Sequence, residues 1–192
     1  RGQDAAGISV CNNDDQLNSR KSMGYVRDVF QQRHMDKLEG NYGIGHVRYP
    51  TAGGAGKEFA QPMYVNSPYG ISLAHNGNLT NSKQLGTQLF HAEMRHLRTD
   101  SDSEVLLNIF AHELGKQREI YPSEKNIFKA VSKTHIRCDG AYAVIALING
   151  YGLVAFRDNN GIRPLSIGVR QGKEREEYIV ASEDALFTPL GF

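Results

Sequence analysis

A chain of 192 residues, 40% hydrophobic and 22% charged, has the size and composition of one globular domain with its own buried core. Its formal net charge is +1 and charges of both signs are interspersed, so the sequence gives no electrostatic reason to expect nucleic acid or an anionic membrane as a partner. The two cysteines lie far apart, which argues against a disulfide framework and for a cytoplasmic protein, and no apolar run approaches the ~20 residues that span a bilayer.

Short apolar runs bounded by turn residues predict the strands of the first half of the chain. These runs lie at 6–10, 17–25, 43–47, 63–65 and 70–75. The turn residues of 12–15 predict that the first two strands form a hairpin. A short helix followed by a loop is expected over 26–38. The segment 48–59 is rich in glycine and alanine, and we interpret it as a mobile loop.

Helical periodicity dominates the middle of the chain and predicts three helices. The first is expected over about 82–97, and the third begins near Ser123. The second follows Ser101, and Glu104 completes a capping-box pattern that places Asp102 in the first helical turn. The residues expected to face the core are Leu85, Leu89 and Phe90 on the first helix, Val105, Leu106, Ile109, Phe110 and Leu114 on the second, and Ile127, Phe128 and Val131 on the third.

The last part of the chain returns to strand patterns, separated by glycine-rich turns. The expected strands lie at 141–148, 153–157, 165–169 and 178–181. Strands are thus followed by helices and again by strands, with hairpin connections and no strand–helix–strand alternation. This order predicts an α+β fold in which antiparallel sheets are covered by helices.

Arg48 follows the apolar strand of 43–47 and precedes the glycine-rich loop. Its planar guanidinium offers a fork of donors that matches a carboxylate. The alternative is an arginine at a strand end that pairs with a surface carboxylate, an interaction usually worth little. The adjoining loop favours a ligand clamp.

Asn76 and Gly77 could together stabilise an oxyanion. The asparagine amide and the glycine backbone N–H both donate hydrogen bonds, and glycine lets an acyl group approach the chain closely. The alternative is structural, because Asn-Gly is the commonest two-residue hairpin turn. A turn explains the dipeptide but neither His75 before it nor the polar residues of 78–81, so both interpretations stay open.

Asp102 could pair with an ammonium group, although an acid at a helix N-terminus is also favoured by the helix dipole alone. A cation, an anion and an oxyanion hole together describe a site for an amino-acid amide. No nucleophile accompanies them: Cys11 lies within an apolar strand and Cys138 at a helix end, and neither has a neighbouring base. The seven histidines show no metal-ligand spacing, so no metal site is expected.

Several long motifs in this order resemble the glutaminase domain of the amidophosphoribosyltransferases, which are class II glutamine amidotransferases. The resemblance covers essentially the whole chain. It rests on residues 1–7, 43–53, 60–62, 66–71, 74–79, 101–104, 157–158 and 161–165. Glucosamine-phosphate synthase and asparagine synthase share the Asn-Gly and arginine elements. They differ around Gln3-Asp4 and Arg163-Pro164, which makes the glutaminase domain of another class II enzyme the alternative.

The resemblance implies a fold and a role for each candidate residue. The fold is the four-layer αββα sandwich of N-terminal-nucleophile hydrolases, in which two antiparallel sheets stack between helices. Arg48 would hold the glutamine carboxylate and Asp102 its ammonium, while Asn76 and Gly77 would form the oxyanion hole. Thr51 is a further substrate contact, and the loop 48–59 would close over the substrate.

The resemblance also implies that residues 1–192 are a glutaminase domain truncated at both ends. The family's N-terminal cysteine, which attacks the glutamine amide with its own α-amino group as the base, is expected upstream of Arg1. A phosphoribosyltransferase domain is expected after Phe192. It would use the released ammonia and phosphoribosyl pyrophosphate, with magnesium, to make phosphoribosylamine for purine synthesis, in a homo-oligomer. No cofactor is expected in the glutaminase domain. A non-catalytic module that only binds glutamine is the other interpretation.

Overall fold

The computed structural model describes residues 4–49 and 56–192. The strands within these ranges pair antiparallel in three hydrogen-bonded groups. The first group, in the order β2-β1-β3, consists of β1 (Ala5–Cys11), β2 (Leu17–Met23) and β3 (Tyr42–Arg48). The second, in the order β4-β5-β6-β7, consists of β4 (Met63–Val65), β5 (Ile71–Leu79), β6 (Gly140–Ile148) and β7 (Gly152–Arg157). The third is the hairpin of β8 (Ser166–Gln171) and β9 (Glu176–Ala181).

The helices form the outer layers. The three long helices are α3 (Ser82–Glu93), α4 (Asp102–Gly115) and α5 (Glu124–Arg137). The short ones are α1 (Val26–Val29) and α2 (Gln32–Met35), together with the 3-10 turns η1 (Lys57–Phe59), η2 (Asp184–Leu186) and η3 (Thr188–Leu190). None of the helices in the described ranges is both long enough and apolar enough to cross a bilayer.

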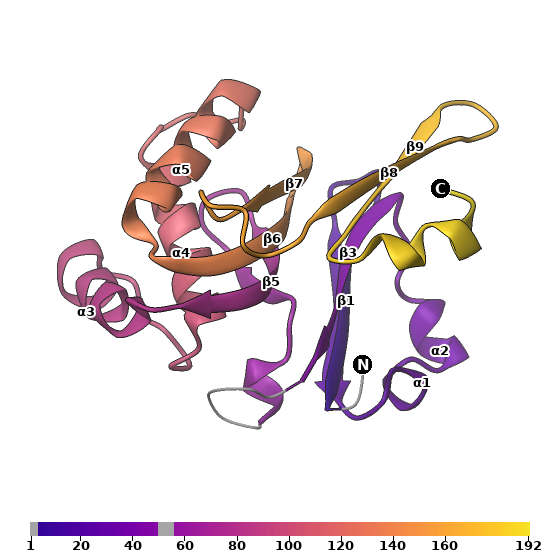
Figure 1. Ribbon diagram of the computed structural model, residues 1–192, viewed down its shortest axis with the longest axis horizontal. Coiled ribbons are helices and arrows are strands. Elements are labelled where there is room, and N and C mark those ends of the chain that lie inside the picture. The colour runs from indigo at the N-terminus through magenta and orange to yellow at the C-terminus, as the bar shows by residue number, and fades with distance from the viewer. Residues whose placement is uncertain (1–3, 50–55) are drawn as a thin grey trace.

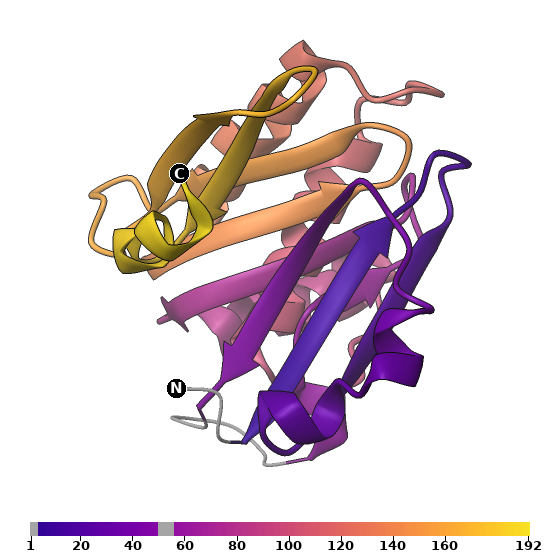
Figure 2. The same ribbon diagram turned by 90° about the vertical axis from the view of Figure 1, so that its right-hand side faces the viewer.

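Two sheets stack between helices, as the sequence and the family resemblance predict. The long helices cover one face of the sheet of β4–β7, and the sheet of β1–β3 lies against its other face, with α1 and α2 beyond it (Figure 1). The strands of the two sheets cross at an angle, and the C-terminal hairpin lies over the end of the stack (Figure 2). The α+β sandwich is therefore confirmed, although its second helical layer consists only of short turns.

The main core lies between the long helices and the sheet of β4–β7. It includes the fully buried side chains of Leu73, Leu106, Phe110 and Ile148. A smaller apolar cluster joins the two sheets and contains Cys11, Ile44, Ala74 and Leu147. Burying large apolar side chains contributes roughly 1.5–3 kcal/mol each, so the sheet that carries Asn76 and Gly77 is held mainly by the helical layer.

Several predicted boundaries and faces were wrong in ways that have local causes. Where a short helix followed by a loop was expected over 26–38, the chain forms two separate helical turns, α1 and α2. The helix expected to reach residue 97 ends at Glu93, because Met94 adopts a left-handed conformation with φ of 52°. Phe90 and Phe128, expected in the core, are 49% and 62% exposed.

The capping box predicted for the second helix is only half formed. Ser101 caps α4 by accepting a hydrogen bond from the Ser103 N–H at 3.3 Å. The Glu104 carboxylate does not return to Ser101. It accepts the backbone N–H groups of Arg98 and Thr99 at 2.9 and 2.8 Å, and so fixes the loop before the helix. The expectation that Asp102 lies in the first turn of this helix is confirmed.

Candidate active site

Asn76 and Gly77 lie in the middle of β5, which does not end at His75 but continues to Leu79. They pair with Ala143 and Tyr142 of β6, so the hairpin-turn interpretation of the Asn-Gly dipeptide was wrong. Gly77 has φ of +154°, and a Cβ built there would lie 2.1 Å from the Ala141 carbonyl oxygen. Only glycine permits this conformation and this close approach of β6.

Asp102 is bonded directly to the same strand. Its Oδ2 atom accepts the backbone N–H of Leu79 at 3.0 Å, and its side chain is 22% exposed. The carboxylate lies in the first turn of α4, where the helix dipole favours it, and it also bonds to the strand two residues beyond Gly77. The structure thus brings Asp102 together with the two oxyanion candidates.

Arg48 ends β3, where it pairs with Ala5 of β1. Its guanidinium lies over the Phe59 ring, with Cζ 5.3 Å from the ring centroid. The Nη1 atom is buried and has no hydrogen-bond partner among residues 4–49 and 56–192, and no carboxylate in those ranges forms an ion pair with it. A half-buried guanidinium with a buried, unused donor is suited to bind a carboxylate.

Two histidines connect the Arg48 strand with β5. His46 lies two residues before Arg48, and burial lowers its pKa to about 4, with further contributions from the charges of His75 and Arg48. His75, directly before Asn76, is 3% exposed, and burial lowers its pKa as well. The strands themselves are in contact, so the end of β3 that carries His46 and Arg48 lies against β5. The described residues give no direct bond between Arg48 and Asp102.

These histidines predict that the protein loses stability in mild acid. Because the His46 pKa is about 4 in the folded state and 6.5 in the unfolded chain, the unfolded state takes up a proton that the folded state refuses. Its contribution is fully present above pH 6.5 and should be lost as the pH falls towards 4. The expected loss is about 3 kcal/mol in the free energy of unfolding, measured by denaturant titration at pH 7 and pH 4. A H46N variant should show a shallower pH dependence, and an unchanged slope would contradict the assignment.

Other sequence expectations can be placed less completely. Thr51, and the part of the 48–59 loop from 50 to 55, lie outside the described residues. Cys11 is fully buried and Cys138 is 5% exposed, as expected for thiols without a catalytic role. Burial raises the Cys138 pKa to about 12. Within the described ranges, no group of three or more His, Cys, Asp or Glu residues could hold a metal ion.

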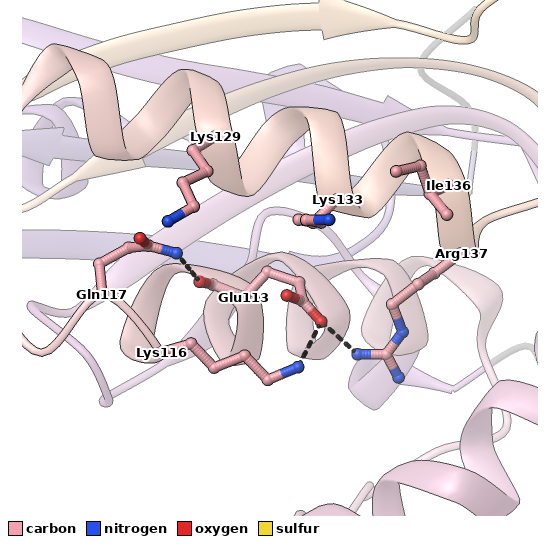
Figure 3. Close-up of a pocket in the computed structure, with 7 residues that line it drawn as sticks. All are labelled: Glu113, Lys116, Gln117, Lys129, Lys133, Ile136 and Arg137. Carbon is pink, nitrogen blue, oxygen red and sulfur yellow. Dashed lines mark hydrogen bonds and ion pairs between the residues drawn. The ribbon is translucent and has the colours of Figure 1, made fainter.

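A hollow of about 370 Å³ lies elsewhere, between α4 and α5. Figure 3 shows its lining, in which Glu113 accepts hydrogen bonds from Lys116 and Arg137 at 2.9 and 2.7 Å. Arg137 also bonds Glu93 at 2.7 Å, so the cluster ties three helices together. Burial alone would raise the Glu113 pKa, but the bonds to Lys116 and Arg137 outweigh it and lower that pKa. None of the candidate residues lines this hollow.

Comparison with known proteins decides what kind of domain carries this arrangement. Residues 54–189 match the family described as the glutamine amidotransferase domain. The chain belongs to this family.

The proteins to which this amidotransferase domain is similar belong to the family that its sequence motifs resemble. Over its whole length it is 58% identical to an amidophosphoribosyltransferase of Pseudomonas aeruginosa and 57% identical to one of Escherichia coli strain K12. It spans 38% of the length of each of these relatives. Among solved structures it is similar to the glutamine phosphoribosylpyrophosphate amidotransferase of B. subtilis in complex with ADP and GMP. That likeness has a TM-score of 0.79 and 33% identity, over 99% of this chain and 38% of the other.

Proposed function

We propose that this domain binds glutamine and supports hydrolysis of its side-chain amide to glutamate and ammonia. The observation that carries the proposal is the bond between Asp102 and β5, two residues beyond Gly77. It sets an anion for the α-ammonium group beside the donors for the amide oxygen. Arg48, with a buried and unused donor, would take the α-carboxylate.

In this proposal each residue acts on a different part of the substrate. The Asn76 side-chain amide and the Gly77 backbone N–H would donate to the oxygen that becomes negatively charged when a nucleophile attacks the amide carbon. Asp102 and Arg48 would fix the other end of the molecule, so that the amide carbon is held at one place. Thr51 would be a further contact.

The whole protein would use the ammonia as the family resemblance implies. An N-terminal cysteine ahead of Arg1 would supply the nucleophile, with its α-amino group as the base. A phosphoribosyltransferase domain after Phe192 would bind phosphoribosyl pyrophosphate with magnesium and form phosphoribosylamine, the first committed product of purine synthesis. We place this protein in the cytoplasm as a homo-oligomer. The relatives' names support the transferase part of this proposal, and their greater length agrees with a second domain; the location and the homo-oligomer rest on the resemblance alone.

Glutamine binding can be tested by calorimetry with an R48A variant. We expect it to weaken glutamine binding about 10- to 100-fold, because a bidentate bond to a charged group is worth about 1.5–3 kcal/mol. R27A is the matched control, since the Arg27 side chain is 84% exposed, 3.8 Å from Asp28, and lies over an aromatic ring (Tyr25, Cζ 5.4 Å from the centroid) as Arg48 does. An R48A variant that folds normally and binds glutamine as the unchanged protein does would overturn the assignment of Arg48.

A further inference from the structure

A buried polar network lies behind the candidate site and involves residues with no assigned role. Gln61, His75 and Ser103 are only 6%, 3% and 3% exposed. The Gln61 side chain accepts the His75 backbone N–H at 2.7 Å and donates to the His75 carbonyl at 3.2 Å. Gln61 precedes β4, which begins at Met63, so no β4 backbone pairs with His75. The Gln61 side chain takes its place and satisfies both the N–H and the C=O of His75.

The backbone at Gln61 is itself held by two neighbouring strands of the other sheet, β1 and β2. The Lys21 ammonium donates to the carbonyl groups of Ala60 and Pro62 at 2.7 and 3.0 Å. Next to Lys21, β1 approaches so closely that a Cβ on Gly7 would lie 2.0 Å from the Gln61 carbonyl oxygen. The backbone around Gln61 is thus anchored to the stacked sheet of β1–β3, and its side chain extends from there to β5.

The Ser103 hydroxyl joins this anchor to Asp102. Its Oγ atom accepts from Gln61 Nε2 at 3.1 Å and lies 2.9 Å from His75 Nδ1. It also donates towards Asp102 Oδ1 at 3.5 Å. Asp102 Oδ2 thus accepts the Leu79 N–H at 3.0 Å, while Oδ1 is oriented by the longer contact with Ser103 at 3.5 Å.

The number of donors and acceptors decides which atom donates in each hydrogen bond from His75 through Ser103 to Asp102. His75 Nε2 is buried without a partner among the described residues. An orphaned N–H is costlier there than an orphaned lone pair, so the ring proton belongs on Nδ1. The Nδ1–H then donates to Ser103 Oγ, and the only hydrogen of that hydroxyl is left for Asp102 Oδ1. With both lone pairs of Ser103 Oγ taken by the donors of Gln61 and His75, the hydroxyl hydrogen is directed to the carboxylate, whose Oδ1 atom also lies 3.9 Å from His75 Nδ1.

We propose that Gln61, His75 and Ser103 are positioning residues that hold the Asp102 carboxylate at a fixed place beside Asn76 and Gly77. They thereby set the preference of the site for an amide that carries an α-ammonium group over the same amide without one. This inference rests on the proposed function, because it assumes that Asp102 faces the substrate ammonium. It adds three residues that do not touch the substrate themselves.

The test compares binding of glutamine with binding of glutaramate, which has the same amide and carboxylate but no amino group. The unchanged protein should prefer glutamine, and S103A should reduce the ratio of the two affinities about fivefold, the effect of one hydrogen bond. Glutaramate affinity should change less than about twofold, because glutaramate makes no use of Asp102. D102N marks the full loss of the preference.

Two histidine variants make the test specific to the chain of bonds. Asparagine places its amide near the position of Nδ1, so H75N should keep the preference within about twofold, whereas H75Q should lose it as S103A does. S9A is the matched control: Ser9 is 1% exposed and its hydroxyl bonds Ser19 and Ser72 at 2.7 and 2.9 Å, outside this network. S9A should leave the affinity ratio unchanged.

The outcomes separate this inference from the proposed function. If the unchanged protein binds neither compound, the proposed function is wrong. If it prefers glutamine and folded S103A keeps the full preference, or loses affinity for both compounds equally, the positioning role is wrong while glutamine binding stands. Should S103A fail to fold, the contrast between H75N and H75Q decides the matter by the same ratio.

Discussion

Replacing Gly77 with alanine is expected to destabilise the domain by at least about 4 kcal/mol and to abolish glutamine binding. The new Cβ would lie 2.1 Å from the Ala141 carbonyl oxygen and 2.7 Å from the Tyr142 Cα, both backbone atoms of the central strand β6. Neither atom can move without opening the β5–β6 ladder. The φ of +154° adds strain for any residue with a side chain.

The expected result can be measured by chemical denaturation together with calorimetry. Gly152 offers a matched control, because it also has a positive φ, of +137°, but no atom lies within 4 Å of a Cβ built there. G152A therefore reports backbone strain alone, of about 1–3 kcal/mol, and should leave glutamine binding intact. If G77A were no less stable than G152A, the close approach of the strands would not be what requires glycine at this position.

This position shows where local sequence patterns stop being informative. The apolar alternation of 70–75 predicts a strand and Asn-Gly predicts its end, because such dipeptides most often form turns. The strand continues to Leu79 because β6 pairs with every residue of this segment. Tertiary pairing overrides the local preference, and the glycine is needed for a contact 65 residues further along the chain, 77 against 142.

The layers and most strands follow from periodicity, since the buried face of each element repeats at the period of its secondary structure. The exposure of the Phe90 and Phe128 rings could not be predicted from periodicity, because an apolar residue at the edge of a helical face can point either to the core or to solvent. Likewise, Glu104 has the spacing of a capping box, yet the preceding loop offers it two free N–H groups.

The candidate site was partly predictable for a similar reason. Arg48, Asn76, Gly77 and Asp102 can be singled out because their chemistry is complementary to one small molecule. Gln61 cannot, since glutamine is usually a surface residue and its role depends on contacts with His75 and Ser103, 14 and 42 residues away. Its only sequence signal is its place in the 60–62 motif, which carries the family resemblance but predicts no contact.

The 192-residue chain by itself is expected to release glutamate from glutamine at least about 10⁴-fold more slowly than a longer version with a leading cysteine. Its two cysteines are poor nucleophiles. Cys11 is fully buried between the sheets, where its thiol donates to Asn149 Oδ1 at 3.3 Å. Cys138 is buried at the end of α5, and burial raises its pKa to about 12, so the reactive thiolate is scarce at neutral pH.

The test measures the rate of glutamate release under the same conditions from three forms: the 192-residue chain, the longer version and its cysteine-to-alanine variant. A longer version with an N-terminal cysteine ahead of Arg1 should be active, and changing that cysteine to alanine should remove the activity while glutamine binding persists. C11S and C138S in the longer version should keep it, because neither thiol contacts the candidate site. If the 192-residue chain released glutamate as fast as the longer version, the nucleophile would lie within this sequence. If both forms bound glutamine and neither hydrolysed it, the domain would be a glutamine-binding module, with Arg48 and Asp102 retained for recognition alone.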